Sequence, residues 1–209
     1  MEARLDLRRV LANRRINIMA PHIAILGWGS LIWDLRPVFD DYHESWKDSG
    51  PTLPLEFSRV SASRENALTF VLDEESGSSC RVWSARSLRK NPDDAIADLR
   101  CREGTTLQNI GFHFQDHSRT RSVSTNVSSI ISTWADQESI DVVVWTDLTS
   151  NFRSKSSQGC HFTVDAAVAH LRSLPPGAKT RAAEYIWRAP LFVDTTFTSK
   201  YMERLSRRP

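Results

Sequence analysis

The sequence predicts an α+β fold: a small mixed, mostly antiparallel β-sheet or β-barrel with helices at its periphery. Two alternating runs around a short turn indicate a β-hairpin at residues 54–72. A well-capped segment indicates a helix at residues 92–103, and a β-branched run indicates a buried strand at residues 141–148. Sequential antiparallel strands with helices outside them make an α+β domain.

The first strand is expected at residues 22–27, a short apolar run of the kind that is buried on both faces of a sheet. It ends in glycine and leads into a turn, Gly27-Trp28-Gly29-Ser30-Leu31, followed by further bulky residues. Residues 34–53 are polar and contain Pro37, Gly50 and Pro51, so they are expected to form a loop with little regular structure.

A meander of three strands is expected next. Residues 54–61 place Leu55 and Phe57 on one face, and residues 67–72 alternate in the same way, with a turn between the two runs. Residues 80–86 then read as a third strand of this meander.

The clearest helix has signals at both ends. Asn91 is a good N-cap, Pro92 suits the first helical position, and Gly104 is a typical stop. The later elements expected from periodicity are an irregular segment at 105–124, helices at 125–135, 163–174 and 178–188, and the strand at 141–148.

Length and charge predict one domain with basic ends. The 209 residues, 40% hydrophobic and 25% charged, suit one soluble globular domain. The net charge is +2, but residues 1–19 and 200–209 each carry +3, which leaves −4 on residues 20–199. We therefore expect a basic N-terminal extension at 1–19, a single domain at 20–199 and a basic C-terminal tail at 200–209. An acidic body argues against a nucleic-acid partner.

The three cysteines, Cys80, Cys101 and Cys160, are widely spaced and form no zinc-binding pattern, which fits a reducing cytoplasm better than a disulfide framework. Arginines interrupt the N-terminal segment, so a secretory signal is not expected. No apolar run is long enough to span a membrane. The sequence therefore predicts a cytoplasmic protein with no membrane partner.

Glu103 is the candidate for acid–base chemistry. It follows Ile96 by seven residues and Leu99 by four, which places all three on one stripe of the helix. A carboxylate that is partly buried, in the last helical turn, is expected to have a raised pKa suited to proton transfer. The alternative is a helix that ends earlier, with Glu103 solvated or paired with Arg81 or Arg100.

The glycine turn is the candidate for binding. Two glycines after a buried strand allow a sharp turn that exposes N–H groups to a carboxylate or an oxyanion. The alternative is a tight strand exit with Trp28 and Trp33 packed in the core. A dinucleotide fingerprint is not favoured, because Ile32 stands where a third glycine would be needed.

Two other chemistries have weaker signals. His113 and His117 are four residues apart, but their surroundings do not look helical and no third ligand stands out, so we expect no metal site. Ser30 follows Gly-x-Gly, which does not match the Gly-x-Ser-x-Gly elbow of esterases.

In their order along the chain, these motifs resemble those of the γ-glutamylcyclotransferase-like family. Members of that family open with a strand and a Tyr-Gly-Ser-Leu type of loop, continue into a hairpin-rich sheet, and carry a catalytic glutamate at the end of a later helix. Here the strand His22–Leu26 leads into Trp28-Gly29-Ser30-Leu31, and the helix Asp93–Arg102 leads into Glu103-Gly104. The resemblance covers about residues 20–148.

The resemblance implies an enzyme that cyclises a γ-glutamyl amide or peptide to 5-oxoproline and releases an amine or amino acid, with no cofactor or metal. It assigns Glu103 as general acid and base, and the loop as the substrate-binding element, formed by Gly27, Trp28, Gly29, Ser30 and Leu31. Trp28 stands where the family has tyrosine, so a phenolic hydroxyl is missing. The competing hypothesis is therefore a non-enzymatic module on the same scaffold that binds a small ligand or a protein.

Overall fold

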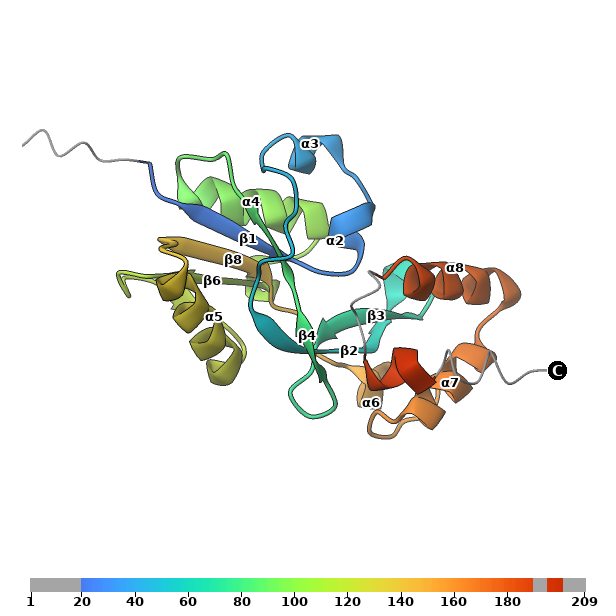
Figure 1. Cartoon of the computed structure of the whole chain (residues 1–209). Helices are drawn as coiled ribbons and strands as arrows, with labels where there is room; N and C mark the ends of the chain where they lie inside the picture. Colours follow the sequence, from blue (N-terminus) through green and yellow to red (C-terminus); the bar gives the residue numbers. More distant parts are fainter. Residues whose placement is uncertain (1–19, 190–194, 201–209) are drawn as a thin grey trace, which may run out of the picture.

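A five-stranded mixed sheet and a three-stranded antiparallel sheet form the framework of the molecule (Figure 1). The computed structural model describes residues 20–189 and 195–200. The strand order is β5-β1-β8-β6-β7 in the larger sheet and β3-β2-β4 in the smaller one. The bounds are β1 Ile23–Gly27, β2 Thr52–Ser61, β3 Ala67–Leu72, β4 Ser78–Arg81, β5 Trp83–Arg86, β6 Ile110–Phe114, β7 Thr120–Arg121 and β8 Val142–Thr146.

The predicted α+β class is confirmed, but the sheets do not close into a barrel. Only β1 and β8 pair in parallel, with Ile23 opposite Val142, and the other pairs of named strands are antiparallel. Each sheet keeps two edge strands, and no ladder between described strands joins β5 to β7. The barrel alternative of the sequence prediction is therefore wrong.

The expected third strand of the meander is two strands in two different sheets. The strand is interrupted at Val82. Before it, β4 pairs with β2 in the small sheet, and after it, β5 pairs with β1 in the large sheet. The amide of Val82 donates to the carbonyl of Pro51, and its own carbonyl accepts from Gly50, so the crossing point is hydrogen-bonded to the preceding loop. This crossing ties the two sheets together.

The segment 105–124, expected to be irregular, contains two strands of the large sheet, β6 and β7. β6 lies between β8 and β7, with Phe112 opposite Val144. Gly111 allows the close packing of this strand, because a Cβ there would lie 2.1 Å from the indole of Trp145. Ile110, Phe112 and Phe114 alternate with Gly111 and His113, so this short strand carries a period-two pattern that the prediction of an irregular segment overlooked.

The main helices cover opposite faces of the large sheet. Helix α4 (Pro92–Glu103) packs on β1, β6 and β8 from one side, and helix α5 (Thr125–Gln137) packs from the other side, against β2 as well (Figure 1). Helices α7 (Val164–Ser173) and α8 (Pro176–Trp187) pack on β3 of the small sheet. Short helices also occur: α2 Ser30–Trp33 after β1, α3 Pro37–Asp40 within the segment expected to be a loop, and α6 Phe152–Lys155 before α7.

The cap signals read from the sequence are confirmed. The Asn91 side chain accepts from the amide of Asp93, as expected, and the Thr163 side chain, at the start of the helix expected at 163–174, accepts from the amide of Ala166. Gly104 ends α4 in the left-handed conformation, with φ +58°. These local signals therefore set the ends of α4 and the start of α7.

Two hydrophobic cores follow from the alternation along the buried strands. Ile23 and Ile25 of β1 pack in one core with Ile96 and Leu99 of α4. Leu26 lies on the other face of β1, in the larger core between the sheets. A strand with both faces covered is apolar throughout, as expected for residues 22–27. The large sheet therefore separates the two cores.

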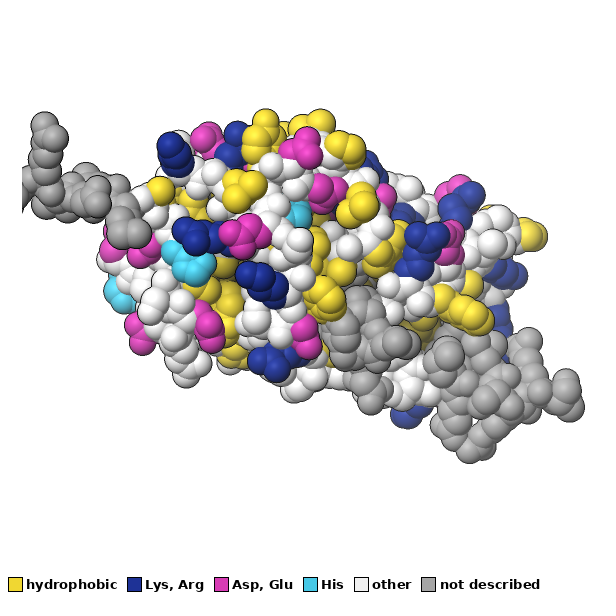
Figure 2. Space-filling view, turned by 45° about the horizontal axis from the view of Figure 1, so that its top comes forward, with side chains coloured by type: hydrophobic (Ala, Val, Ile, Leu, Met, Phe, Trp, Pro, Cys, Tyr) yellow, Lys and Arg dark blue, Asp and Glu magenta, His cyan; other side chains and the backbone are white. Residues whose placement is uncertain are grey.

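The charged ends expected from the sequence lie largely outside the described residues, namely 1–19 and 201–209. On the face shown in Figure 2, basic and acidic side chains are interspersed.

No helix in the described part of the chain is long and apolar enough to cross a membrane.

Glu56 of β2 is a carboxyl group inside the larger core. It is fully buried, and its oxygens accept hydrogen bonds from the amides of Phe57, at 2.8 Å, and Phe197, at 3.4 Å. Burial raises the pKa of Glu56 to about 7, against an ordinary value of 4.5. Ionisation of Glu56 is therefore easier in the unfolded chain than in the native protein.

We predict that this group makes the protein less stable as pH rises. Between about pH 4.5 and 7 the native state holds the Glu56 proton more tightly than the unfolded state, so the free energy of unfolding falls with pH in this window. The shift corresponds to roughly 3 kcal/mol at most. Glu56→Gln cannot titrate, so denaturant unfolding at pH 5, 6, 7 and 8 should show a flatter profile. Parallel profiles for the two proteins would contradict the prediction.

Candidate functional site

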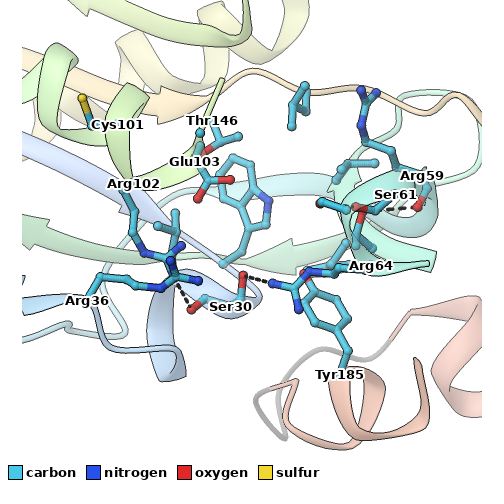
Figure 3. Close-up of a pocket in the computed structure, with 18 residues that line it drawn as sticks. Ser30, Arg36, Arg59, Ser61, Arg64, Cys101, Arg102, Glu103, Thr146 and Tyr185 are labelled. Carbon is cyan, nitrogen blue, oxygen red and sulfur yellow. Dashed lines mark hydrogen bonds between the residues drawn. The ribbon is translucent and has the colours of Figure 1, made fainter. Parts of the chain in front are cut away.

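A pocket of about 350 Å³ opens where the two sheets meet (Figure 3). It is walled by the loop after β1, the end of α4, the end of β8, the β2–β3 hairpin and α8. The residues that line it are Trp28, Ser30, Leu31, Arg36, Arg59, Ser61, Ser63, Arg64, Thr69, Phe70, Val71, Cys101, Arg102, Glu103, Gly104, Thr146, Leu148 and Tyr185. The pocket thus contains both the predicted acid–base residue and three residues of the predicted binding loop.

Glu103 is the last residue of α4 and is half-buried in this pocket. Leu99 and Ile96, one and two turns earlier on the same stripe, are buried in the core under α4. The helical spacing therefore brings the Glu103 carboxylate to the edge of the sheet.

Burial dominates the electrostatics of Glu103. Loss of water raises the pKa of its carboxyl above the ordinary value. The positive charges of Arg102, Arg64 and Arg36 oppose this rise in the pKa without cancelling it. Because no salt bridge to Glu103 is found among the described residues, its carboxylate remains available to a ligand.

The loop at residues 27–31 lines the pocket with its larger residues and not with its two glycines. Trp28, Ser30 and Leu31 line it, whereas Gly27 and Gly29 do not. Gly27 ends β1 opposite Trp83 and lies against the indole of Trp46.

Gly29 adopts φ +55° and ψ −134°, a conformation that glycine alone adopts easily. This backbone turn allows α2 to begin at Ser30 directly after the strand. The two glycines therefore shape the loop, and its side chains face the pocket.

Arg102 holds the loop in place from α4. Its guanidinium donates to the backbone carbonyls of Ser30, at 3.1 Å, and Asp34, at 2.8 Å, and its side chain is only 5% exposed. The carboxylate of Asp34 lies 3.6 Å away from the same guanidinium. Arg102 therefore fixes the loop relative to its neighbour Glu103.

Arg64 and Tyr185 form the opposite wall. Arg64, from the 3₁₀ turn between β2 and β3, donates to the hydroxyl of Ser30 at 3.1 Å, and its guanidinium lies 4.7 Å from the centre of the Tyr185 ring. Burial raises the pKa of the Tyr185 hydroxyl, with the backbone N–H groups of Phe70 and Ser30 acting in the opposite direction. The Ser30 amide thus faces a phenol supplied by α8.

Thr146 is an unexpected member of the site. It ends β8 and is 6% exposed, and its hydroxyl has no hydrogen-bond partner among the described residues. Figure 3 shows its side chain beside the carboxylate of Glu103. An unsatisfied buried hydroxyl costs free energy, so a polar group in the pocket would find a partner here.

The histidine pair lies outside the pocket. His113 of β6 contacts Thr120 and Gln115, and its ring meets that of His117 edge-on at 5.7 Å. Within residues 20–189 and 195–200, no group of three or more metal-ligating side chains is close enough to hold a metal ion.

Sequence reasoning missed Thr146, Arg59, Arg64 and Tyr185 as pocket residues. The two arginines belong to a hairpin that reads as an ordinary half-exposed ribbon, and Tyr185 belongs to a helix far along the chain. No local pattern marks them, because only the packing of the two sheets brings them to Glu103.

Comparison with protein-family models, curated proteins and solved structures finds no match for this chain.

Replacement of Gly29 should disturb the site more than replacement of Gly104. Gly29→Ala would strain the backbone and place a Cβ 2.6 Å from the Tyr185 hydroxyl. Gly104 has a similar φ, but a Cβ at that position would meet no atom of the described residues within 4 Å beyond its chain neighbours. We expect Gly29→Ala to lower the free energy of unfolding by about 3 kcal/mol or more and Gly104→Ala by about 1 kcal/mol. Denaturant titration measures both, and equal losses would contradict the steric argument.

Proposed function

We propose that the protein is a γ-glutamylcyclotransferase-like enzyme, which converts a γ-glutamyl amide or peptide to 5-oxoproline and an amine or amino acid. The observation that carries the proposal is the half-buried Glu103 carboxylate, with raised pKa and without an ion-pair partner, in one pocket with Trp28, Ser30 and Leu31. The order of these motifs along the chain supports the same family and its fold.

In this reaction the α-amine of the substrate attacks its own γ-amide carbonyl. The ammonium group must first lose a proton, and Glu103 accepts it. Attack forms the ring C–N bond and a tetrahedral oxyanion, and collapse breaks the original amide C–N bond. Glu103 returns its proton to the departing nitrogen as that bond breaks, and the freed carboxylate then takes the second proton from the ring nitrogen and passes it to the released amine. One carboxyl with a raised pKa can perform both transfers.

The other pocket residues orient the substrate for ring closure. Arg64 and the hydroxyl of Ser30 are already joined by a hydrogen bond and form a cationic wall for the α-carboxylate. The Thr146 hydroxyl lies beside Glu103, where it can accept a hydrogen bond from the α-ammonium group. Because the nucleophile and the carbonyl belong to one molecule, a fixed geometry supplies much of the rate enhancement.

The alternative is a binding module on the same scaffold, and one observation favours it. The phenol of Tyr185 is near the Ser30 amide, so that N–H group is less available to an oxyanion. Such a module would bind a small anionic ligand in the same pocket and would release no product.

Glu103→Gln should abolish turnover with little change in folding. It preserves the size of the side chain but removes the base, so we expect kcat/KM to fall at least about 10²-fold. Release of 5-oxoproline from γ-glutamyl dipeptides, γ-glutamyl amines and glutathione measures the effect. Glu138→Gln, at an exposed position after α5, is the matched control. Full activity in Glu103→Gln would exclude this mechanism, and no product from the wild type would favour the binding module.

Thr146→Val should weaken the reaction without weakening the fold. Valine preserves the shape and removes a hydroxyl that has no partner within the described structure, so the free energy of unfolding should stay the same or rise. We expect kcat/KM to fall about 10-fold through loss of one substrate hydrogen bond. Ser58→Ala removes another buried hydroxyl without a partner, outside the pocket, and should leave kcat/KM unchanged. Equal activity in both variants would remove Thr146 from the site.

A further inference from the structure

The pocket holds more positive charge than its one carboxylate balances. Four arginines line it, against Glu103 alone. Arg36 and Arg102 lie 3.0 and 3.6 Å from the carboxylate of Asp34, which offsets much of their charge. Arg59 and Arg64 form no ion pair with any described residue, so two cations face the pocket without an anionic partner.

Arg59 lies apart from the other arginines. It extends from β2, and one of its N–H groups donates to the carbonyl of Thr149 at 2.7 Å. Figure 3 shows its guanidinium on the opposite side of the pocket from Glu103. Partial burial lowers the pKa of Arg59, because water solvates its charge less well there than in the open.

The surroundings of Arg59 are polar. Ser61 and Thr69 of the hairpin also line the pocket near Arg59, and the Thr69 hydroxyl donates to the backbone carbonyl of Arg59. A guanidinium with free N–H groups beside hydroxyl groups suits a carboxylate, because charge-assisted hydrogen bonds are the strongest that such a ligand can form.

A γ-glutamyl peptide has a charge pattern that matches this pocket. Its ammonium group requires an anion, supplied by Glu103, and its α-carboxylate requires a cation, supplied by Arg64 at the Ser30 wall. Glu103 and Arg64 then hold the γ-glutamyl half and the departing nitrogen, which leaves the Arg59 end of the pocket for the rest of the departing half. A plain amine there would leave the Arg59 charge without a partner, whereas an amino acid would place a second carboxylate beside it.

We propose that the end of the pocket around Arg59 is a second anion subsite that selects γ-glutamyl compounds whose departing half carries a carboxylate. This inference rests on the proposed function, since it assumes that the γ-glutamyl group lies at Glu103. Such a subsite would distinguish γ-glutamyl amino acids and peptides from γ-glutamyl amines of equal size.

The test compares two ligands that differ only in that carboxylate, γ-glutamylalanine and γ-glutamylethylamide. Calorimetric binding to Glu103→Gln, which slows turnover and removes the ammonium contact for both ligands alike, gives the ratio of their dissociation constants. We expect γ-glutamylalanine to bind at least about 10-fold more tightly. Adding Arg59→Gln should reduce this ratio to about 2-fold or less, by weakening γ-glutamylalanine alone.

Two further variants test whether the selectivity depends on the charge at position 59 and not on a general effect of losing an arginine. Arg59→Lys preserves the charge and should retain most of the selectivity, and Arg172→Gln, on the exposed face of α7, should change neither dissociation constant. Equal binding of the two ligands, a ratio that Arg59→Gln leaves unchanged, or no binding of either ligand would overturn the subsite. Failure of the wild type to release 5-oxoproline while the ligands still bind selectively would instead overturn the proposed reaction and preserve the subsite.

Discussion

The parallel pairing of β1 and β8 is the constraint on which the site depends. Parallel strands end at the same edge of a sheet, so the turn after Gly27 and the end of β8 at Thr146 emerge side by side. Both strands are buried on both faces, which fixes their register through packing from two cores. Helix α4 lies over this pair, and its last residue, Glu103, therefore reaches the same edge.

The second half of the pocket depends on the crossing at Val82. Because β4 and β5 are consecutive along the chain but lie in different sheets, the small sheet is held against the edge where β1 and β8 end. The β2–β3 hairpin then presents Arg59 and Arg64, and α8 places Tyr185 behind Gly29. The pocket is therefore an interface between two sheets and not a property of either one.

Charge in this interface is distributed in a way that suits proton transfer. Arg102 satisfies backbone carbonyls of the loop and the carboxylate of Asp34. Desolvation is thus the larger influence on Glu103, and its pKa rises despite three nearby guanidinium groups. A carboxyl group that remains without a fixed partner can exchange protons with a ligand.

The sequence by itself determined the features that are local. Asn91, Pro92 and Gly104 set the ends of α4 through capping and backbone preference, and the stripe of Ile96, Leu99 and Glu103 follows from helical geometry. The tertiary structure alone decided the rest. β6 lies between β8 and β7 in the large sheet, Thr146 reaches the pocket because β8 pairs with β1, and Arg59 reaches it because the small sheet lies against that edge. The pairing of Ile23 with Val142 joins residues more than 100 positions apart, and no short window of sequence encodes it.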